Sequence, residues 1–121
     1  MKKITILSAI AMLMVACGGG PKSVAEDFTR ALYTCNTEKA ITLAGLKKGT
    51  QDGEFVAGKL GAACAEMKEK GMVFSGIKES TVTSESDSSA SVRVTSKFKN
   101  GSTETDTINL YKEDGKWIVK L

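Results

Sequence analysis

The fold is decided by the C-terminal stretch, residues 92–121, which reads VRVTSKFKNGSTETDTINLYKEDGKWIVKL. Apolar and polar residues alternate along much of it, and this period of two is typical of strands with one buried and one solvated face. The alternation is interrupted at Asn100-Gly101 and at Asp114-Gly115, which are both hairpin signals. The stretch therefore predicts three antiparallel strands joined by two tight turns.

The register of the first hairpin follows from which residues must share a face. A two-residue loop at Asn100-Gly101 would send Ile108 to the wrong face of the sheet. We therefore expect a three-residue loop over 99–101, with Gly101 in a left-handed conformation as a bulge. This loop pairs Val92 with Ile108.

The second hairpin needs no such correction. A two-residue loop of Asp114 and Gly115 already pairs Leu110 with Val119, so the apolar residues stay on one face. The last strand is then expected to add three residues to the core: Trp117, Val119 and Leu121.

One more strand is expected upstream, over residues 73–84, followed by a polar turn at 85–88. In the strand after that turn, the predicted inward set is Ala90, Val92, Val94 and Phe98. The opposite sheet surface is expected to be rich in hydroxyl and basic groups, which suits either contact with a ligand or mere solubility. Its members are Ser91, Arg93, Thr95, Ser96, Lys97, Lys99, Thr103, Thr105 and Thr107.

Residues 21–70 carry a helical period instead. A first helix is indicated by apolar residues spaced four, four and three apart: Val24, Phe28, Leu32 and Cys35. Its start is open between a capping box of Ser23 with Glu26 and a helix that begins at Pro21. A second short helix is predicted over 38–43, capped by Asn36 or Thr37.

A third helix is predicted over 53–70, ending at Gly71. Its apolar stripe is Val56, Leu60, Ala63, Cys64 and Met67. The neighbouring face is unusually small, and consists of Ala57, Gly58, Gly61, Ala62 and Ala65. Interior glycines weaken a helix, so we expect this face either to pack closely on another element or to form a pocket floor.

The N-terminus has the anatomy of an export signal, with two lysines followed by the uncharged, largely apolar run 4–16. That run is too short to span a membrane. Met14-Val15-Ala16-Cys17 resembles a bacterial lipobox, which implies a diacylglycerol on the Cys17 thiol and a further acyl chain, such as palmitate, on its amino group. The alternative is an ordinary secretory peptide that leaves Cys17 as a free thiol.

This reading divides the chain into a signal peptide at 1–16, a lipidated cysteine with a flexible tether at 17–21, and a single domain at 22–121. The expected location is the bacterial envelope, anchored to the membrane through Cys17. The absence of an acidic residue just after Cys17 favours the outer membrane facing the periplasm.

Composition narrows the functions that the domain can have. The chain contains no histidine, which removes the commonest metal ligand and general base. Loss of Lys2 and Lys3 leaves 15 basic and 14 acidic residues, a formal charge of +1, which gives no support to nucleic-acid binding. We therefore expect no metal site, no cofactor and no nucleic-acid partner.

Cys35 and Cys64 remain as an even pair in an oxidising compartment. They form either a disulfide between the first and third helices or two buried free thiols. Sequence spacing does not decide between these alternatives.

Two quoted segments, PKSVAEDFTRALYTCNTEKAITLA (21–44) and residues 92–121, resemble the two ends of a bacterial lipoprotein family of unknown function. The resemblance implies an α+β fold in which three N-terminal helices pack on a four-stranded antiparallel meander. This is the cone of nuclear transport factor 2 (NTF2) and ketosteroid isomerase.

The resemblance leaves three functions open, because a fold does not determine an activity. The preferred interpretation is a non-catalytic module, not an enzyme, that binds a small ligand, a glycan or an envelope protein. A structural or inhibitory protein is a second possibility. An isomerase-like enzyme would need an inward carboxylate, Asp106 or Glu104, with Tyr33 or Tyr111 as hydrogen-bond donor. No catalytic residue is otherwise indicated, and this end of the hairpin is expected to be solvated on both faces.

Overall fold

The computed structural model describes residues 20–121, so the predicted signal peptide and Cys17 lie outside the described residues. The elements follow one another as α2 (Pro21–Tyr33), α3 (Thr37–Leu43), α4 (Gln51–Glu69), β1 (Phe74–Glu85), β2 (Ser89–Phe98), β3 (Thr103–Glu113) and β4 (Lys116–Lys120). The strands form one antiparallel sheet in the order β1-β2-β3-β4. The predicted α+β class, with three helices before a four-stranded meander, is confirmed.

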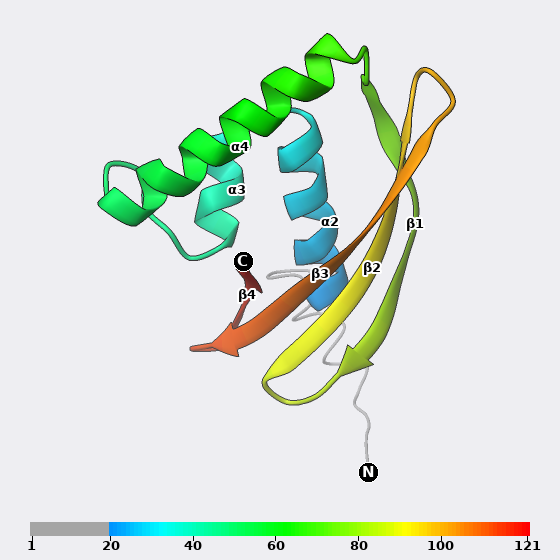
Figure 1. The fold of residues 1–121 in the computed structure, drawn as a ribbon. Coiled ribbons are helices and arrows are strands. Elements are labelled where there is room, and N and C mark those ends of the chain that lie inside the picture. Colours follow the sequence, from blue (N-terminus) through cyan, green and yellow to red (C-terminus); the bar gives the residue numbers. More distant parts are fainter. Residues whose placement is uncertain (1–19) are drawn as a thin grey trace.

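The sheet is curved, and its concave side is filled by α2 (Figure 1). This helix contacts all four strands, whereas the main contacts of α4 are with α3 and α2. The helices therefore form two tiers, with α2 against the sheet and α4 on the outside.

The core lies between α2 and the three C-terminal strands. Its α2 residues are Val24, Ala25, Phe28 and Ala31. Its strand residues are Val92, Val94, Ile108, Leu110 and Val119, and Ala40 and Ala44 at α3 complete the cluster. These are the inward positions of the alternating pattern, so burial of one strand face against one helix face stabilises the domain.

Both predicted hairpin registers are confirmed. Val92 pairs with Ile108, and Gly101 has a φ of 91° in the three-residue loop. Leu110 pairs with Val119, and the two residues of the second loop, Asp114 and Gly115, both have positive φ. The requirement that the apolar residues of paired strands share one face was therefore sufficient to choose between a bulged and an unbulged turn.

The start of each helix is set by a capping residue close to it in the sequence. Gly20 is the N-cap of α2 with Pro21 at its first turn, which settles the start that the sequence left open. The Asn36 side chain accepts a hydrogen bond from the Lys39 backbone N–H and caps α3. Thr50 caps α4, so this helix begins two residues earlier than predicted.

The expectation for the small face of α4 is wrong. Gly58, Gly61, Ala62 and Ala65 are exposed, and a Cβ added at Gly58 or Gly61 would meet nothing within 4 Å. The reason is that α2 already occupies the concave face of the sheet, so α4 covers the other helices with one side only. This face neither packs closely nor forms a pocket floor.

Two strand residues also differ from their expected positions. Leu121 is 63% exposed, because β4 ends at Lys120 and the chain passes beyond the core. Ser96 was expected on the polar outer surface, but it is fully buried. It has the same parity as Val94 and Phe98, so its side chain must lie on their face whatever its polarity.

Candidate functional site

A cavity of about 390 Å³ lies between the start of α4, the α3–α4 corner and the end of β4. Most of its walls are apolar. The lining residues are Ala44, Leu46, Asp52, Phe55, Val56, Tyr111, Val119, Lys120 and Leu121. Its volume is in the range of small-molecule sites, and the hollow is shallow and wide open to solvent.

The corner that holds this cavity is fixed by backbone contacts. Gly45 has a φ of 79°, and a Cβ at this position would lie 3.2 Å from Ile118 Cγ2. The Thr50 hydroxyl donates to the Lys47 carbonyl oxygen at 2.7 Å and accepts from the Gly53 N–H at 3.1 Å. These contacts set the direction in which α4 leaves the corner, and so where its first turns line the cavity.

Large apolar side chains gather at the cavity with much of their surface in solvent. Phe55 is 64% exposed, Leu121 63% and Tyr111 37%. Among the residues that the structure describes, only Val73 and Val82 are further large apolar side chains with comparable exposure. Such a concentration of exposed apolar groups around a hollow indicates an interaction site.

A second, smaller cavity of about 200 Å³ lies at the other end of α4. It is lined by Tyr33, Thr34, Cys35, Cys64, Met67, Lys68, Met72, Val73 and Phe74. In the structure a disulfide joins Cys35 and Cys64, whose Cα atoms are 5.8 Å apart. Cys35 has a φ of 66°, which turns the chain out of α2 and brings its sulfur to α4.

Tyr33 and Asp106 form the main polar contact inside the cone. The Tyr33 hydroxyl donates to Asp106 Oδ2 at 2.6 Å. Burial raises the pKa of Tyr33 well above its usual range, and the hydrogen bond to Asp106 and its negative charge raise it further. The Tyr33 ring also stacks on Phe74 and meets the edge of Phe98, with centroids 5.9 and 5.1 Å away.

The structure therefore brings together two of the four residues considered for an isomerase-like pocket, Tyr33 and Asp106. Tyr111 is not with them, because it lines the larger cavity beside Gly45. Asp106 and Glu104 line neither cavity. Sequence reasoning missed Phe55, although its position off the apolar stripe of α4 already marked it as an exposed aromatic.

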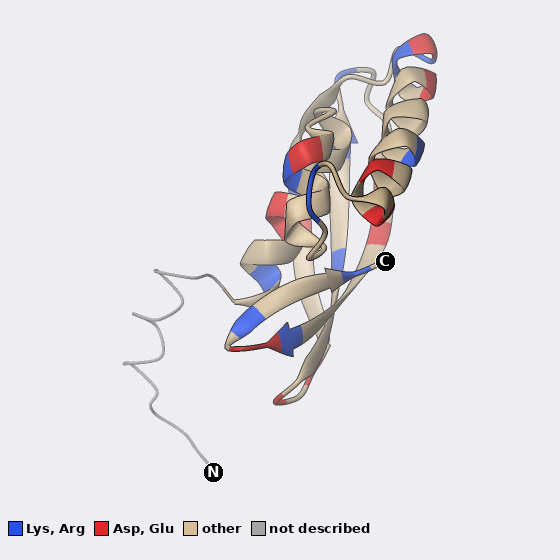
Figure 2. Cartoon of the chain, turned by 90° about the vertical axis from the view of Figure 1, so that its left-hand side faces the viewer, with Lys and Arg blue, Asp and Glu red and all other residues tan. Residues whose placement is uncertain are grey.

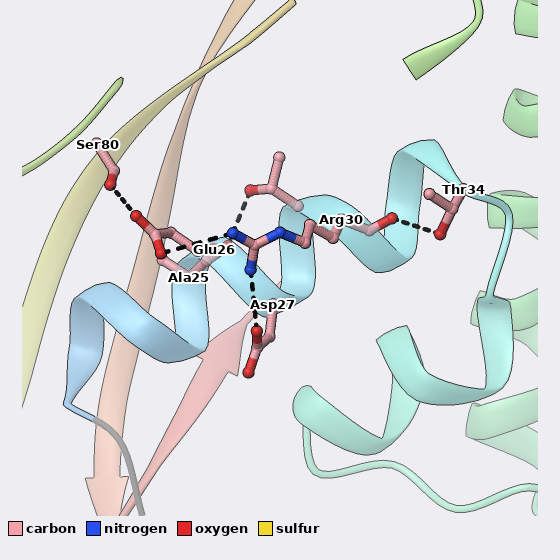
Figure 3. Close-up of polar contacts among 7 residues, drawn as sticks. Ala25, Glu26, Asp27, Arg30, Thr34 and Ser80 are labelled. Atoms are coloured by element: carbon pink, nitrogen blue, oxygen red, sulfur yellow. Dashed lines mark hydrogen bonds and ion pairs between the residues drawn. The ribbon is translucent and has the colours of Figure 1, made fainter. Parts of the chain in front are cut away.

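A polar network at the edge of α2 is structural (Figure 3). Glu26 accepts a hydrogen bond from Ser80 of β1 and lies 4.0 Å from the Arg30 guanidinium, which also contacts Asp27 at 3.3 Å. The network connects α2 to β1 at a place where neither cavity lies.

Charges of both signs are interspersed along the helices and at the strand ends (Figure 2). Within residues 20–121, no cluster of His, Cys, Asp and Glu side chains could hold a metal ion. No helix of the same range is long and apolar enough to cross a membrane.

Comparison with protein families matches residues 15–120 to the domain of unknown function DUF4878. The chain belongs to the DUF4878 family. This confirms the predicted membership of a family of unknown function. A comparison of the DUF4878 chain with curated proteins finds no match.

Among solved structures, the DUF4878 chain is similar to a protein of Campylobacter jejuni that bears the provisional name NTF2-like transpeptidase. The identity is 29%, the TM-score is 0.66, and the match covers 84% of this chain and 98% of that one. The predicted NTF2-like fold is thereby confirmed. A provisionally named calcium/calmodulin dependent protein kinase II association domain from Xanthomonas campestris matches at 20% identity and a TM-score of 0.40, over 80% and 78% of the two chains.

Proposed function

We propose that the protein is a lipid-anchored envelope protein whose NTF2-like domain is a non-catalytic binding module for a small apolar ligand. The anchor is Cys17, acylated after removal of residues 1–16, and the membrane is the outer membrane facing the periplasm. The ligand occupies the cavity between α4 and β4. The single observation that supports binding is this apolar cavity of about 390 Å³ with exposed Phe55 and Leu121 beside it.

The charges at the cavity favour an apolar body with one polar end. Asp52 and Lys120 are the charged residues in the lining, and Tyr111 supplies a hydroxyl. A few polar groups beside an otherwise apolar wall are the usual means of orienting a ligand.

We propose no enzymatic reaction for this site. An isomerase needs a carboxylate that faces its substrate, whereas Asp106 is engaged by Tyr33 and lines neither cavity. The name of the Campylobacter protein concerns acyl transfer, which needs an activated nucleophile. In this chain Cys35 and Cys64 are bonded to each other, and the sequence offers no histidine as a base.

The anchor is tested by Cys17→Ser in cells. We expect the variant to leave the membrane fraction, because the acyl chains provide the attachment. Mass spectrometry of the processed wild-type N-terminus should show the added fatty acids. An unmodified N-terminus, or a variant that stays in the membrane fraction, would remove the anchor from the proposal.

The cavity is tested with a soluble form, residues 17–121 with Cys17→Ser, because the helices, strands and core that the structure describes all lie within 21–120. Anilinonaphthalene sulfonate serves as the apolar fluorescent ligand. Val56→Glu places a charge in the cavity wall and should weaken its binding by at least about ten-fold, equivalent to about 1.4 kcal/mol.

Ala62→Glu is the matched control, because it places the same charge on the exposed side of the same helix. It should bind like the wild type. Equal titration curves for Val56→Glu and the wild type would show that the dye binds elsewhere, and the cavity would lose its proposed role.

A further inference from the structure

Helix α4 is weakly held for its length. Of its 19 residues only Gly53 and Cys64 are buried. Four apolar side chains, Val56, Ala57, Leu60 and Met67, are half-buried against the rest of the protein. Segments with little buried apolar surface are the ones that open locally below the threshold of global unfolding.

Two fixed points hold α4 in place. One is the corner at its start, where Thr50 bonds Gly53 and Lys47. The other is the disulfide from Cys64 to Cys35 at the end of α2. Because the main noncovalent contacts of α4 are with α3 and α2 and not with the sheet, loss of the disulfide leaves its C-terminal half without a strong attachment.

Residues of α4 line both cavities. Its first turns give Asp52, Phe55 and Val56 to the larger one, and its last turns give Cys64 and Met67 to the smaller one. A tilt of the whole of α4 about the corner at its start would therefore move one wall of both hollows, and the smaller one most.

We propose that α4 is a lid held closed by the Cys35–Cys64 disulfide, and that a dithiol protein of the envelope opens it by reducing that bond. This regulation rests on the proposed binding function, because the first turns of α4 form one wall of the same cavity.

The smaller cavity gives a reductant its route to the bond. Cys35 is half-buried and Cys64 is 5% exposed, and both line this cavity. A thiolate of the reductant attacks Cys35 Sγ, so a mixed disulfide forms, the bond to Cys64 breaks, and Cys64 leaves as a thiolate that takes a proton from water. The second thiol of the reductant then displaces Cys35, and the reductant ends as a disulfide after supplying two electrons.

Hydrogen exchange of the full acylated chain in detergent micelles tests the lid. We compare the oxidised protein with the same protein reduced by tris(carboxyethyl)phosphine. After reduction, amides of α4 should exchange at least about ten-fold faster than before, and at least about ten-fold faster than amides of β2 and β3 in the same sample. The matched control is Cys35→Ser/Cys64→Ser, which should behave like the reduced protein and not respond to the phosphine.

Alkylation of the reduced protein gives a second readout that does not depend on exchange. With α4 open, N-ethylmaleimide should modify Cys64 at a rate within about three-fold of Cys35, although Cys64 is buried in the closed state. Unchanged exchange in α4, or protection of Cys64 after reduction, would overturn the lid. So would equal acceleration of α4, β2 and β3, because the disulfide would then stabilise the domain as a whole.

The lid and the proposed ligand site are tested by independent measurements, so one can be refuted without the other. A dye titration insensitive to Val56→Glu would remove the ligand without affecting the exchange of α4. Unchanged exchange of α4 would remove the lid without affecting the dye titration.

Discussion

Ser96→Ala should make the protein more stable, which is the opposite of what most substitutions at a fully buried position do. The side chain is 0% exposed, and its Oγ has no hydrogen-bond partner among residues 20–121. Its neighbours across the sheet are Ile77 of β1 and Glu104 of β3. A buried hydroxyl without a partner loses its hydration and gains nothing in return.

The expected gain is the difference between two effects. Relief from an unsatisfied buried hydroxyl contributes about 1–3 kcal/mol. The void left by a single oxygen atom costs on the order of 0.5 kcal/mol, at about 24 cal/mol per Å³. Ser96→Ala should therefore raise the free energy of unfolding by about 1 kcal/mol, which corresponds to a rise in Tm of about 4–8 °C for a domain of this size.

Urea unfolding of residues 17–121 with Cys17→Ser measures this change, with the single tryptophan, Trp117, as the fluorescent reporter. The control is Thr29→Val, because Thr29 is equally buried but its hydroxyl donates to the Ala25 carbonyl oxygen at 2.9 Å. That variant should lose about 0.5–1 kcal/mol. A loss of more than about 0.5 kcal/mol in Ser96→Ala would show that the hydroxyl has a partner, and would refute the reasoning.

Two further predictions concern the glycines of α4 and the half-buried Tyr33. A Cβ at Gly53 would lie 2.0 Å from the Lys47 carbonyl oxygen, so Gly53→Ala should destabilise the protein by more than about 1 kcal/mol. Gly61→Ala meets open space in the same helix and should stabilise it by about 0.5–1 kcal/mol, as measured by thermal unfolding. Folding raises the pKa of Tyr33, so the neutral phenol stabilises the folded state. This contribution to the free energy of unfolding is fully present below about pH 10. It is lost as the pH rises further, by at most about 1.4 kcal/mol per pH unit. Urea unfolding above pH 10 should therefore weaken less steeply in Tyr33→Phe than in the wild type.

Each of these predictions has a clear contrary result. Equal effects of alanine at Gly53 and Gly61 would mean that the α3–α4 corner yields to an added methyl group. Parallel stability curves for the wild type and Tyr33→Phe above pH 10 would mean that Tyr33 ionises as readily in the folded as in the unfolded protein.

The sequence by itself determined the elements, their order and the register of both C-terminal hairpins. These features are local: helix and strand periods, caps at Asn36 and turns at Gly101 and Gly115 depend on residues a few positions apart. The alternation of side chains then set the register of each hairpin, because a shift by one residue would turn every apolar side chain of a strand outward.

The tertiary structure alone decided which faces are covered and which polar groups meet. Tyr33 and Asp106 are 73 residues apart, and only the crossing of α2 over β3 brings them together. The small face of α4 is exposed because α2 had already filled the concave side of the sheet, a fact that no property of α4 encodes. The ligand cavity likewise exists only where the α3–α4 corner meets β4, since packing between distant segments, and not the period of any one of them, leaves the space between Phe55 and Leu121.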